Sequence, residues 1–166
     1  MRAARLFGVG DLRVGDEPVP EAGPGTSLVQ VTAVGICGSD LHWWDEGAIG
    51  DAKLDHPLVL GHEGAGVITG GARSGLRVAI DPAIPDETCR ACRDGYRNLC
   101  YSIRFSGHGE TDGMMRELMP WPSHLLHPLP DRAAADPVAA GRWRVADRRG
   151  RAAGAPARGG GPLGCG

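Results

Sequence analysis

Only the first 131 residues of this 166-residue chain carry enough apolar side chains to build a hydrophobic core. From residue 132 onward, 28 of the 35 residues are Ala, Gly, Pro or Arg. A segment of that composition cannot offset the conformational entropy that it would lose on ordering. The sequence therefore predicts one folded domain over residues 1–131 and a disordered tail over residues 132–166.

The charge balance changes at the same point. Residues 1–131 hold 11 basic and 18 acidic side chains, a net charge of −7, whereas residues 132–166 hold 7 and 2, a net charge of +5. An acidic body disfavours nucleic-acid binding, and the basic tail has almost no aromatic side chains on which bases stack. No apolar run approaches the roughly 20 residues that span a bilayer, and no secretory signal pattern is present. We therefore expect a cytoplasmic protein that binds neither nucleic acid nor membranes.

The folded part has the pattern of many short strands joined by glycine-rich turns. Leu28–Val34 alternates apolar and polar residues and is rich in β-branched types, which is typical of a strand. Further strands are expected over residues 58–60, 64–69 and 77–81, and a short helix is expected from Ser39, with that serine as its N-cap. The pattern predicts a mostly β (α+β) domain shaped as a partly open β-barrel with short helices.

Two short motifs place reactive side chains on glycine-rich turns. The first has a thiol, a hydroxyl, a carboxylate and an imidazole within six residues, namely Cys37, Ser39, Asp40 and His42. The second, 20 residues beyond His42, has His62 and Glu63 between glycines. A thiolate and an imidazole from two segments suit Zn²⁺. Taken singly, Cys37 is equally compatible with a small buried apolar residue and His62 with a structural histidine.

A second group of cysteines follows. Cys89 and Cys92 form a C-x2-C pair, a frequent zinc element, and Cys100 lies eight residues further on. Because cytosolic thiols normally stay reduced, five cysteines in a chain without a secretory signal favour metal binding over disulfides. Three thiolates alone leave a tetrahedral zinc site incomplete.

Together the motifs resemble one enzyme family. G-x-C-G-S-D-x-H followed by L-G-H-E-x-x-G is the signature of the zinc-dependent medium-chain alcohol and polyol dehydrogenases. The resemblance implies a GroES-like catalytic domain with a zinc lobe, and Zn²⁺ and NAD or NADP as cofactors. It also implies a Rossmann domain, which does not follow Asp131. We therefore expect a truncated chain that has no dehydrogenase activity of its own and forms no stable oligomer.

The resemblance assigns roles to the side chains of the first group. Cys37 and His62 match the ligands of the catalytic zinc, and Glu63 matches a carboxylate that is a ligand in some members and a neighbour in others. Asp40 matches the carboxylate that orients the histidine ligand, a role that metal sites generally need. Zinc chemistry fits these roles, because Zn²⁺ lowers the pKa of a bound hydroxyl and stabilises the alkoxide.

Ser39 and His42 match the relay that carries the alcohol proton towards solvent in the family. A purely structural zinc site has no use for such a relay. These two residues therefore separate the dehydrogenase hypothesis from its main alternative, a zinc-binding structural or partner-binding module without catalysis. A third possibility, a zinc-knuckle nucleic-acid binder with a basic tail, is disfavoured by the acidic body.

The resemblance also completes the second cysteine group. In the family this lobe carries four cysteines and ends G-x-x-N-L-C, so Gly95 and Asn98–Cys100 place Asp86 at the first ligand position. The implied structural zinc ligands are Asp86, Cys89, Cys92 and Cys100. An aspartate can bind zinc, so a site with three cysteines and one aspartate is reasonable. The alternatives are a lobe that has lost its metal or one that binds it weakly.

Further stretches resemble the sorbitol, L-iditol and L-idonate dehydrogenase branch, and they imply a polyol or sugar-acid substrate. They are residues 41–51, 56–62 and 103–107, although Trp43, Trp44 and Phe105 within them are equally compatible with ordinary packing. Between Thr69 and Arg77 the chain is shorter than the family pattern, which either shortens a surface hairpin or disturbs the next strand. Gly159–Gly164 matches a phosphate-loop pattern but lacks the preceding buried strand, which favours chance composition.

Overall fold

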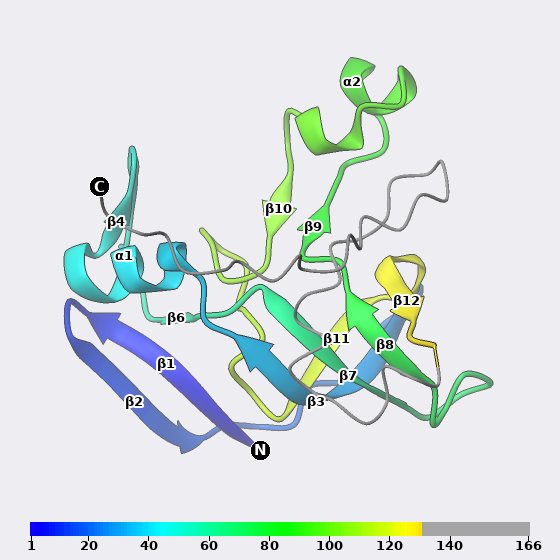
Figure 1. Cartoon of the computed structure of the whole chain (residues 1–166), viewed down its shortest axis with the longest axis horizontal. Coiled ribbons are helices and arrows are strands. Elements are labelled where there is room, and N and C mark those ends of the chain that lie inside the picture. Colours follow the sequence, from blue (N-terminus) through cyan, green and yellow to red (C-terminus); the bar gives the residue numbers. More distant parts are fainter. Residues whose placement is uncertain (131–166) are drawn as a thin grey trace, which may run out of the picture.

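The computed structural model describes residues 1–130 of the chain, and Figure 1 shows how their elements are arranged. The predicted tail over residues 132–166 and the phosphate-loop pattern at Gly159–Gly164 lie outside the described residues. The domain boundary at residue 131 therefore stays a prediction.

The largest sheet has five strands, and each pair of neighbours is antiparallel. In spatial order the strands are β11 (Leu118–Pro122), β3 (Thr26–Gly35), β7 (Glu63–Thr69), β8 (Arg77–Ile80) and β12 (Leu126–Pro128). Apolar side chains from these strands form the main core, among them Val29, Ile68, Val78, Met119 and Trp121. Strand β8 forms and pairs on both sides, so the short connection between Thr69 and Arg77 shortens a hairpin and leaves the strand intact.

A smaller sheet lies beside the large one and carries a second core (Figure 1). Its strands are β2 (Asp11–Asp16), β1 (Arg2–Gly8) and β6 (Leu58–Val59). Leu6 and Leu58 from this sheet pack against Trp43 of helix α1 (Gly38–Glu46). A further short pair after the helix is β4 (Ala48–Ile49) and β5 (Ala52–Lys53). The predicted mostly β fold is confirmed, and in residues 1–130 the sheets stay open and do not close into a barrel.

The expected start of the helix was wrong by two residues. Cys37, not Ser39, is the N-cap of α1. The reason is that the Asp40 carboxylate accepts a hydrogen bond from the backbone N–H of Cys37 at 2.9 Å, which fixes the first turn from inside the helix. The helix ends at Gly47, which adopts the left-handed conformation that favours glycine. Across residues 1–130, no helix is long and apolar enough to cross a bilayer.

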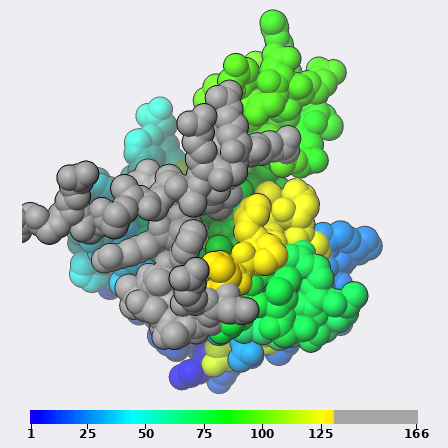
Figure 2. Space-filling model, turned by 45° about the vertical axis from the view of Figure 1, so that its right-hand side comes forward, coloured from blue at the N-terminus to red at the C-terminus, as the bar shows by residue number. Residues whose placement is uncertain are grey.

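A narrow lobe projects from the body of the molecule (Figures 1 and 2). Its elements, in chain order, are β9 (Ala83–Ile84), α2 (Arg90–Arg93), the 3-10 helix η1 (Arg97–Leu99) and β10 (Arg104–Phe105). Strands β9 and β10 pair as a two-stranded ribbon that carries the lobe. Glu87 contacts Arg97 within the lobe, and its carboxylate lies 3.4 Å from Nε2 of His124 in the 3-10 helix η2 (Ser123–Leu125). This carboxylate therefore connects the lobe to the body.

The two central strands approach each other closely at Gly66. Strand β3 has a register shift between Val31 and Ala33, and Gly66 of β7 pairs with Val31 beside it. A Cβ atom at Gly66 would lie 2.3 Å from the Gln30 carbonyl oxygen and 2.6 Å from Val29 Cγ1. Both distances are too short for any side chain, so the close approach of the two strands at this position requires glycine.

We expect Gly66→Ala to lower the free energy of unfolding by about 1–3 kcal/mol, because the added methyl must displace backbone atoms of β3. Gly15→Ala in β2 is the matched control, since a Cβ atom there has no atom within 4 Å. The control should be neutral or stabilising by up to about 1 kcal/mol. Urea unfolding measures both, and equal free energies of unfolding for the two variants would contradict the close approach.

Candidate metal centres

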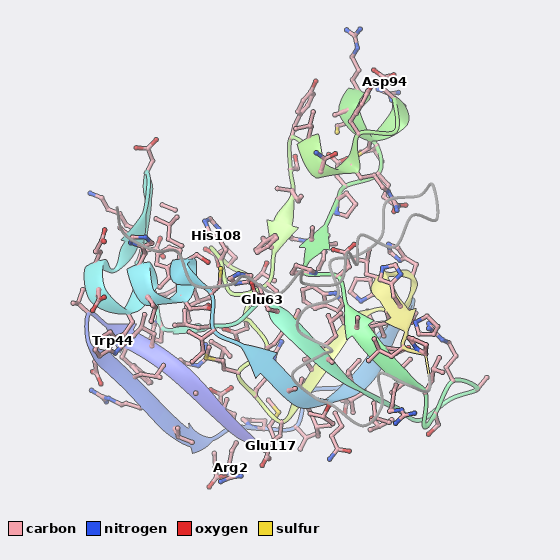
Figure 3. All side chains as sticks on the ribbon, in the orientation of Figure 1. Arg2, Trp44, Glu63, Asp94, His108 and Glu117 are labelled. Carbon is pink, nitrogen blue, oxygen red and sulfur yellow. The ribbon has the colours of Figure 1, made fainter. Side chains whose placement is uncertain are left out.

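The central strand pair brings the first group of predicted ligands together. Gly35 at the end of β3 pairs with Glu63 at the start of β7. Cys37 follows Gly35 by two residues and His62 precedes Glu63, so both reach the same end of the pair. The possible metal-binding atoms of Cys37, His62 and Glu63 all lie within 4.8 Å of one another. Figure 3 shows Glu63 near the centre of the molecule, at the start of β7.

The Glu63 carboxylate needs a glycine opposite it. A Cβ atom on Gly35 would lie 2.7 Å from Oε2 of Glu63 and 3.2 Å from its Cβ atom. Any larger residue at position 35 would push the carboxylate away from the group. The glycine of the first motif therefore leaves room for the carboxylate of the second.

Asp40 joins the two motifs. Its side chain is buried, and its two oxygens accept hydrogen bonds from the backbone N–H groups of Cys37 at 2.9 Å and Gly61 at 3.1 Å. Nδ1 of His62 lies 3.7 Å from Oδ1 of Asp40, which is an ion-pair distance and too long for a hydrogen bond. The carboxylate therefore holds both ligand-bearing segments chiefly through their backbones.

The two residues of the predicted relay have different surroundings. Oγ of Ser39 lies 3.4 Å from Nε2 of His62, so this hydroxyl borders the group of ligands. His42 is exposed, and its Nδ1 lies 2.8 Å from Oε1 of Glu46 one turn further along α1. Positions 39 and 42 share one face of the helix. The structure thus brings Ser39 to the group of ligands and leaves His42 at the surface.

Three side chains from the β10 end of the lobe ribbon and the turn after it also border this region. The ring of Phe105 lies 5.4 Å from the ring of His62, and Ser106 is fully buried with its hydroxyl donating to the Gly61 carbonyl at 2.9 Å. His108 packs edge-on against Trp43, which identifies Trp43 as a core residue, while Trp44 is exposed. Sequence reasoning placed Ser106 only within the family-like stretch 103–107 and assigned no role to it or to His108.

The lobe holds the second group. The ligand atoms of Asp86, Cys89, Cys92 and Cys100 also lie within 4.8 Å of one another. Cys89 is the N-cap of α2, and Cys100 ends η1 with its sulfur accepting a hydrogen bond from the backbone N–H of Asp86 at 3.2 Å. Four donors are enough for a closed tetrahedral zinc site, and here the Asp86 carboxylate stands where a fourth cysteine or a histidine is usual.

Two hydrogen bonds stabilise the ionised form of the Asp86 carboxylate. Oδ1 accepts hydrogen bonds from the backbone N–H groups of Cys89 at 2.9 Å and Thr88 at 2.8 Å. These bonds lower the pKa of Asp86 to about 2. Desolvation, together with the neighbouring sulfurs and carboxylate, raises the pKa of Cys92 to about 12. The ionised Asp86 carboxylate makes it harder for the neighbouring cysteine thiols to lose their protons. A bound cation would offset that negative charge and lower the pKa of the thiols.

Comparison with known proteins matches the folded region to a described family. Residues 23–131 fit the family model of the alcohol dehydrogenase GroES-like domain. The sorbitol dehydrogenase of Rattus norvegicus is 39% identical over 132 residues, which cover 76% of this chain and 37% of the rat protein.

Solved structures give the same result. L-idonate 5-dehydrogenase from Escherichia coli superposes with a TM-score of 0.73 and 31% identity, covering 79% of this chain and 40% of that one. 2R,3R-butanediol dehydrogenase from Bacillus subtilis superposes with a TM-score of 0.66 and 29% identity, covering 78% and 40%. The chain therefore spans about two fifths of the length of these relatives.

Removing the Asp40 carboxylate tests the connection between the motifs. We expect Asp40→Ala to lower the free energy of unfolding by about 2–4 kcal/mol in the presence of a chelator, because two backbone N–H groups lose a charged acceptor. Asp45→Ala, at an exposed position of the same helix, should change it by less than about 0.5 kcal/mol. Chemical denaturation measures both, and a loss at Asp40 no larger than that at Asp45 would contradict the connection.

The low pKa of Asp86 predicts the pH at which its carboxylate takes up a proton. In the metal-free chain this group should titrate near pH 2 instead of its ordinary 3.8. Since the folded pKa is the lower one, the turn is fully stabilised above about pH 4 and weakens as the pH falls towards 2. Carboxyl NMR shifts follow the titration, and Asp86→Asn identifies its signal. A midpoint near 3.8 would show that the two N–H contacts are absent in solution.

Proposed function

Because the chain belongs to the alcohol dehydrogenase family through its GroES-like domain, we propose that it is the metal-binding part of a dehydrogenase that oxidises a polyol or another secondary alcohol. Members of this family are zinc-dependent oxidoreductases. The predicted family and fold class are thereby confirmed. The observation that carries the proposal is the meeting of Cys37, His62 and Glu63 beside the Ser39 hydroxyl.

The first donor set fits a catalytic zinc. Cys37, His62 and Glu63 offer sulfur, nitrogen and oxygen donors, which leaves a fourth tetrahedral position for substrate. When bound there, Zn²⁺ would supply Lewis-acid chemistry that lowers the pKa of an alcohol hydroxyl. The four donors of the lobe, in contrast, leave no open position, so we assign them to a structural zinc.

The chain's own residues would handle the proton. Ser39 borders the ligands, where its hydroxyl can accept the proton of the alcohol and pass it on. His42, on the same helix face and exposed, would release it to solvent. Asp40 holds the backbones of the two ligand-bearing segments, so its role is to position the ligands.

The relatives suggest the class of substrate. The names sorbitol, L-idonate and butanediol describe compounds that carry a secondary alcohol beside another hydroxyl. We propose a polyol or sugar acid of this kind, with NAD or NADP as the hydride acceptor. In residues 1–130 there is no parallel dinucleotide-binding sheet. The chain by itself is therefore proposed to lack dehydrogenase activity, because no hydride acceptor would be held near the metal.

The remaining assignments follow from charge and thiol chemistry. The acidic body disfavours nucleic acid and anionic membrane partners. Four cysteines within the described residues are free, as cytoplasmic conditions would keep them. We propose a cytoplasmic protein. From the family resemblance, and not from charge or thiol chemistry, we also propose that this domain forms no stable oligomer.

One observation favours a second candidate function. His42 pairs with Glu46, and the contacts seen in residues 1–130 do not join it to Ser39. Without that relay the domain would be a zinc-binding module with a structural or partner-binding role.

Metal stoichiometry tests the proposal. We expect the purified chain to bind two zinc ions, and Cys37→Ala and Cys89→Ala to bind one each, because each variant removes a ligand from a different site. Cys165→Ala is the matched control for loss of a thiol and should keep both ions. Elemental analysis measures the ions per chain. Zinc content unaffected by Cys37→Ala would refute the proposed catalytic site, and oxidation of sorbitol by the chain with added NAD would refute its proposed inactivity.

A further inference from the structure

Two polar residues are buried in the described part of the chain, and both bind backbone groups of the same residue, Gly61. They are Asp40 and Ser106, the latter with no exposed surface at all. Asp40 accepts from the N–H of Gly61, and the Ser106 hydroxyl donates to the carbonyl of Gly61. Gly61 directly precedes the predicted ligand His62. These two buried side chains therefore meet at the residue that directly precedes the histidine.

The hydrogen bonds of Gly61 are complete. Its N–H donates to Asp40 at 3.1 Å, and its carbonyl accepts from the Ser106 hydroxyl at 2.9 Å and from the Met114 N–H at 3.0 Å. A carbonyl oxygen has two lone pairs, so the hydroxyl fills the place that the backbone leaves open. Gly61 also has a φ of 98°, where other residues are strained. The two peptide groups that flank the Cα atom of Gly61 are thus both held by hydrogen bonds, in a conformation that glycine adopts readily and other residues do not.

The turn that carries Ser106 packs directly on the backbone of Gly61. A Cβ atom on Gly107 would lie 3.0 Å from the backbone nitrogen of Gly61, so no larger residue allows the approach. Phe105, on the other side of Ser106, places its ring 5.4 Å from the ring of His62. The turn therefore contacts both the backbone and the ring of the histidine segment.

The hydroxyl is not needed to fill space. An alanine would occupy most of the same volume, and a buried hydroxyl stabilises only where it has a partner. We propose that Ser106 is a positioning residue, whose hydroxyl fixes the peptide group between Gly61 and His62 so that His62 points at the metal. This inference rests on the proposed function, since it requires a metal at Cys37, His62 and Glu63.

Loss of the hydroxyl should weaken that site alone. Partners that orient a ligand typically change metal affinity by roughly 10- to 100-fold when removed. We expect Ser106→Ala to lower affinity at the first site by that factor. The lobe site, with its own ligands Asp86, Cys89, Cys92 and Cys100, should keep the parent affinity and serves as an internal reference.

The experiment is a Co²⁺ titration of the metal-free chain followed by its visible spectrum. Cys37→Ala supplies the spectrum of the lobe alone, which is subtracted to isolate the first site. Ser27→Ala is the matched control, because the Ser27 hydroxyl on β3 bonds to the hydroxyl of Ser123 in η2 at 2.8 Å and to none of the candidate ligands. We expect Ser27→Ala to retain the parent affinity at both sites.

Ser106→Thr separates positioning from stability. The added methyl should lower the melting temperature, because the site is fully buried. The retained hydroxyl should nevertheless recover at least part of the first-site affinity relative to Ser106→Ala. Affinity that falls in step with melting temperature across both variants would overturn the inference in favour of a structural role.

The outcomes also distinguish the inference from the proposed function. Two Co²⁺ ions in the parent with unchanged first-site affinity in Ser106→Ala would overturn the inference and leave the proposed function standing. A parent spectrum identical to that of Cys37→Ala would overturn both.

Discussion

The antiparallel pairing of β3 with β7 is the constraint on which the first candidate metal centre depends. The register that sets Gly35 against Glu63 brings the ends of two motifs, separated by 20 residues, to one place. The buried Asp40 carboxylate then ties the backbones of Cys37 and Gly61 together across that end. Since a buried carboxylate is costly unless its oxygens are hydrogen-bonded, the pairing and the carboxylate support each other.

The two metal centres are built in different ways. The lobe collects its donors within one short segment, whose turn is shaped by the Asp86 carboxylate and the N-cap at Cys89. The first centre needs the pairing of β3 with β7, because its donors come from the ends of these two strands, which are far apart in sequence. The lobe is linked back to the first centre by β10, which leads directly into Phe105 and Ser106. This connection places Phe105 and Ser106 beside the segment of the candidate ligand His62.

Close backbone approaches explain why glycine recurs around the first centre. Gly35 leaves room for the Glu63 carboxylate, and Gly66 lets β7 lie close to β3 beside its register shift. Gly107 lets the turn after β10 lie on Gly61. Each would place a side-chain carbon at 3.0 Å or less from a neighbouring atom. The backbone packing around the first centre therefore requires positions without side chains as well as the reactive groups.

Local patterns in the sequence were enough to predict the family, four of the strands and the side chains that gather in the two candidate metal sites, because alternation and motif spacing depend on residues near one another in the chain. They did not predict that Cys37 caps α1, since the decisive hydrogen bond comes from Asp40 inside the helix. Nor did they reveal the role of Ser106 or the surface position of His42. Those features were decided by tertiary packing, because a serine 45 residues beyond Gly61 acquires its partner only when the lobe ribbon folds back onto β7.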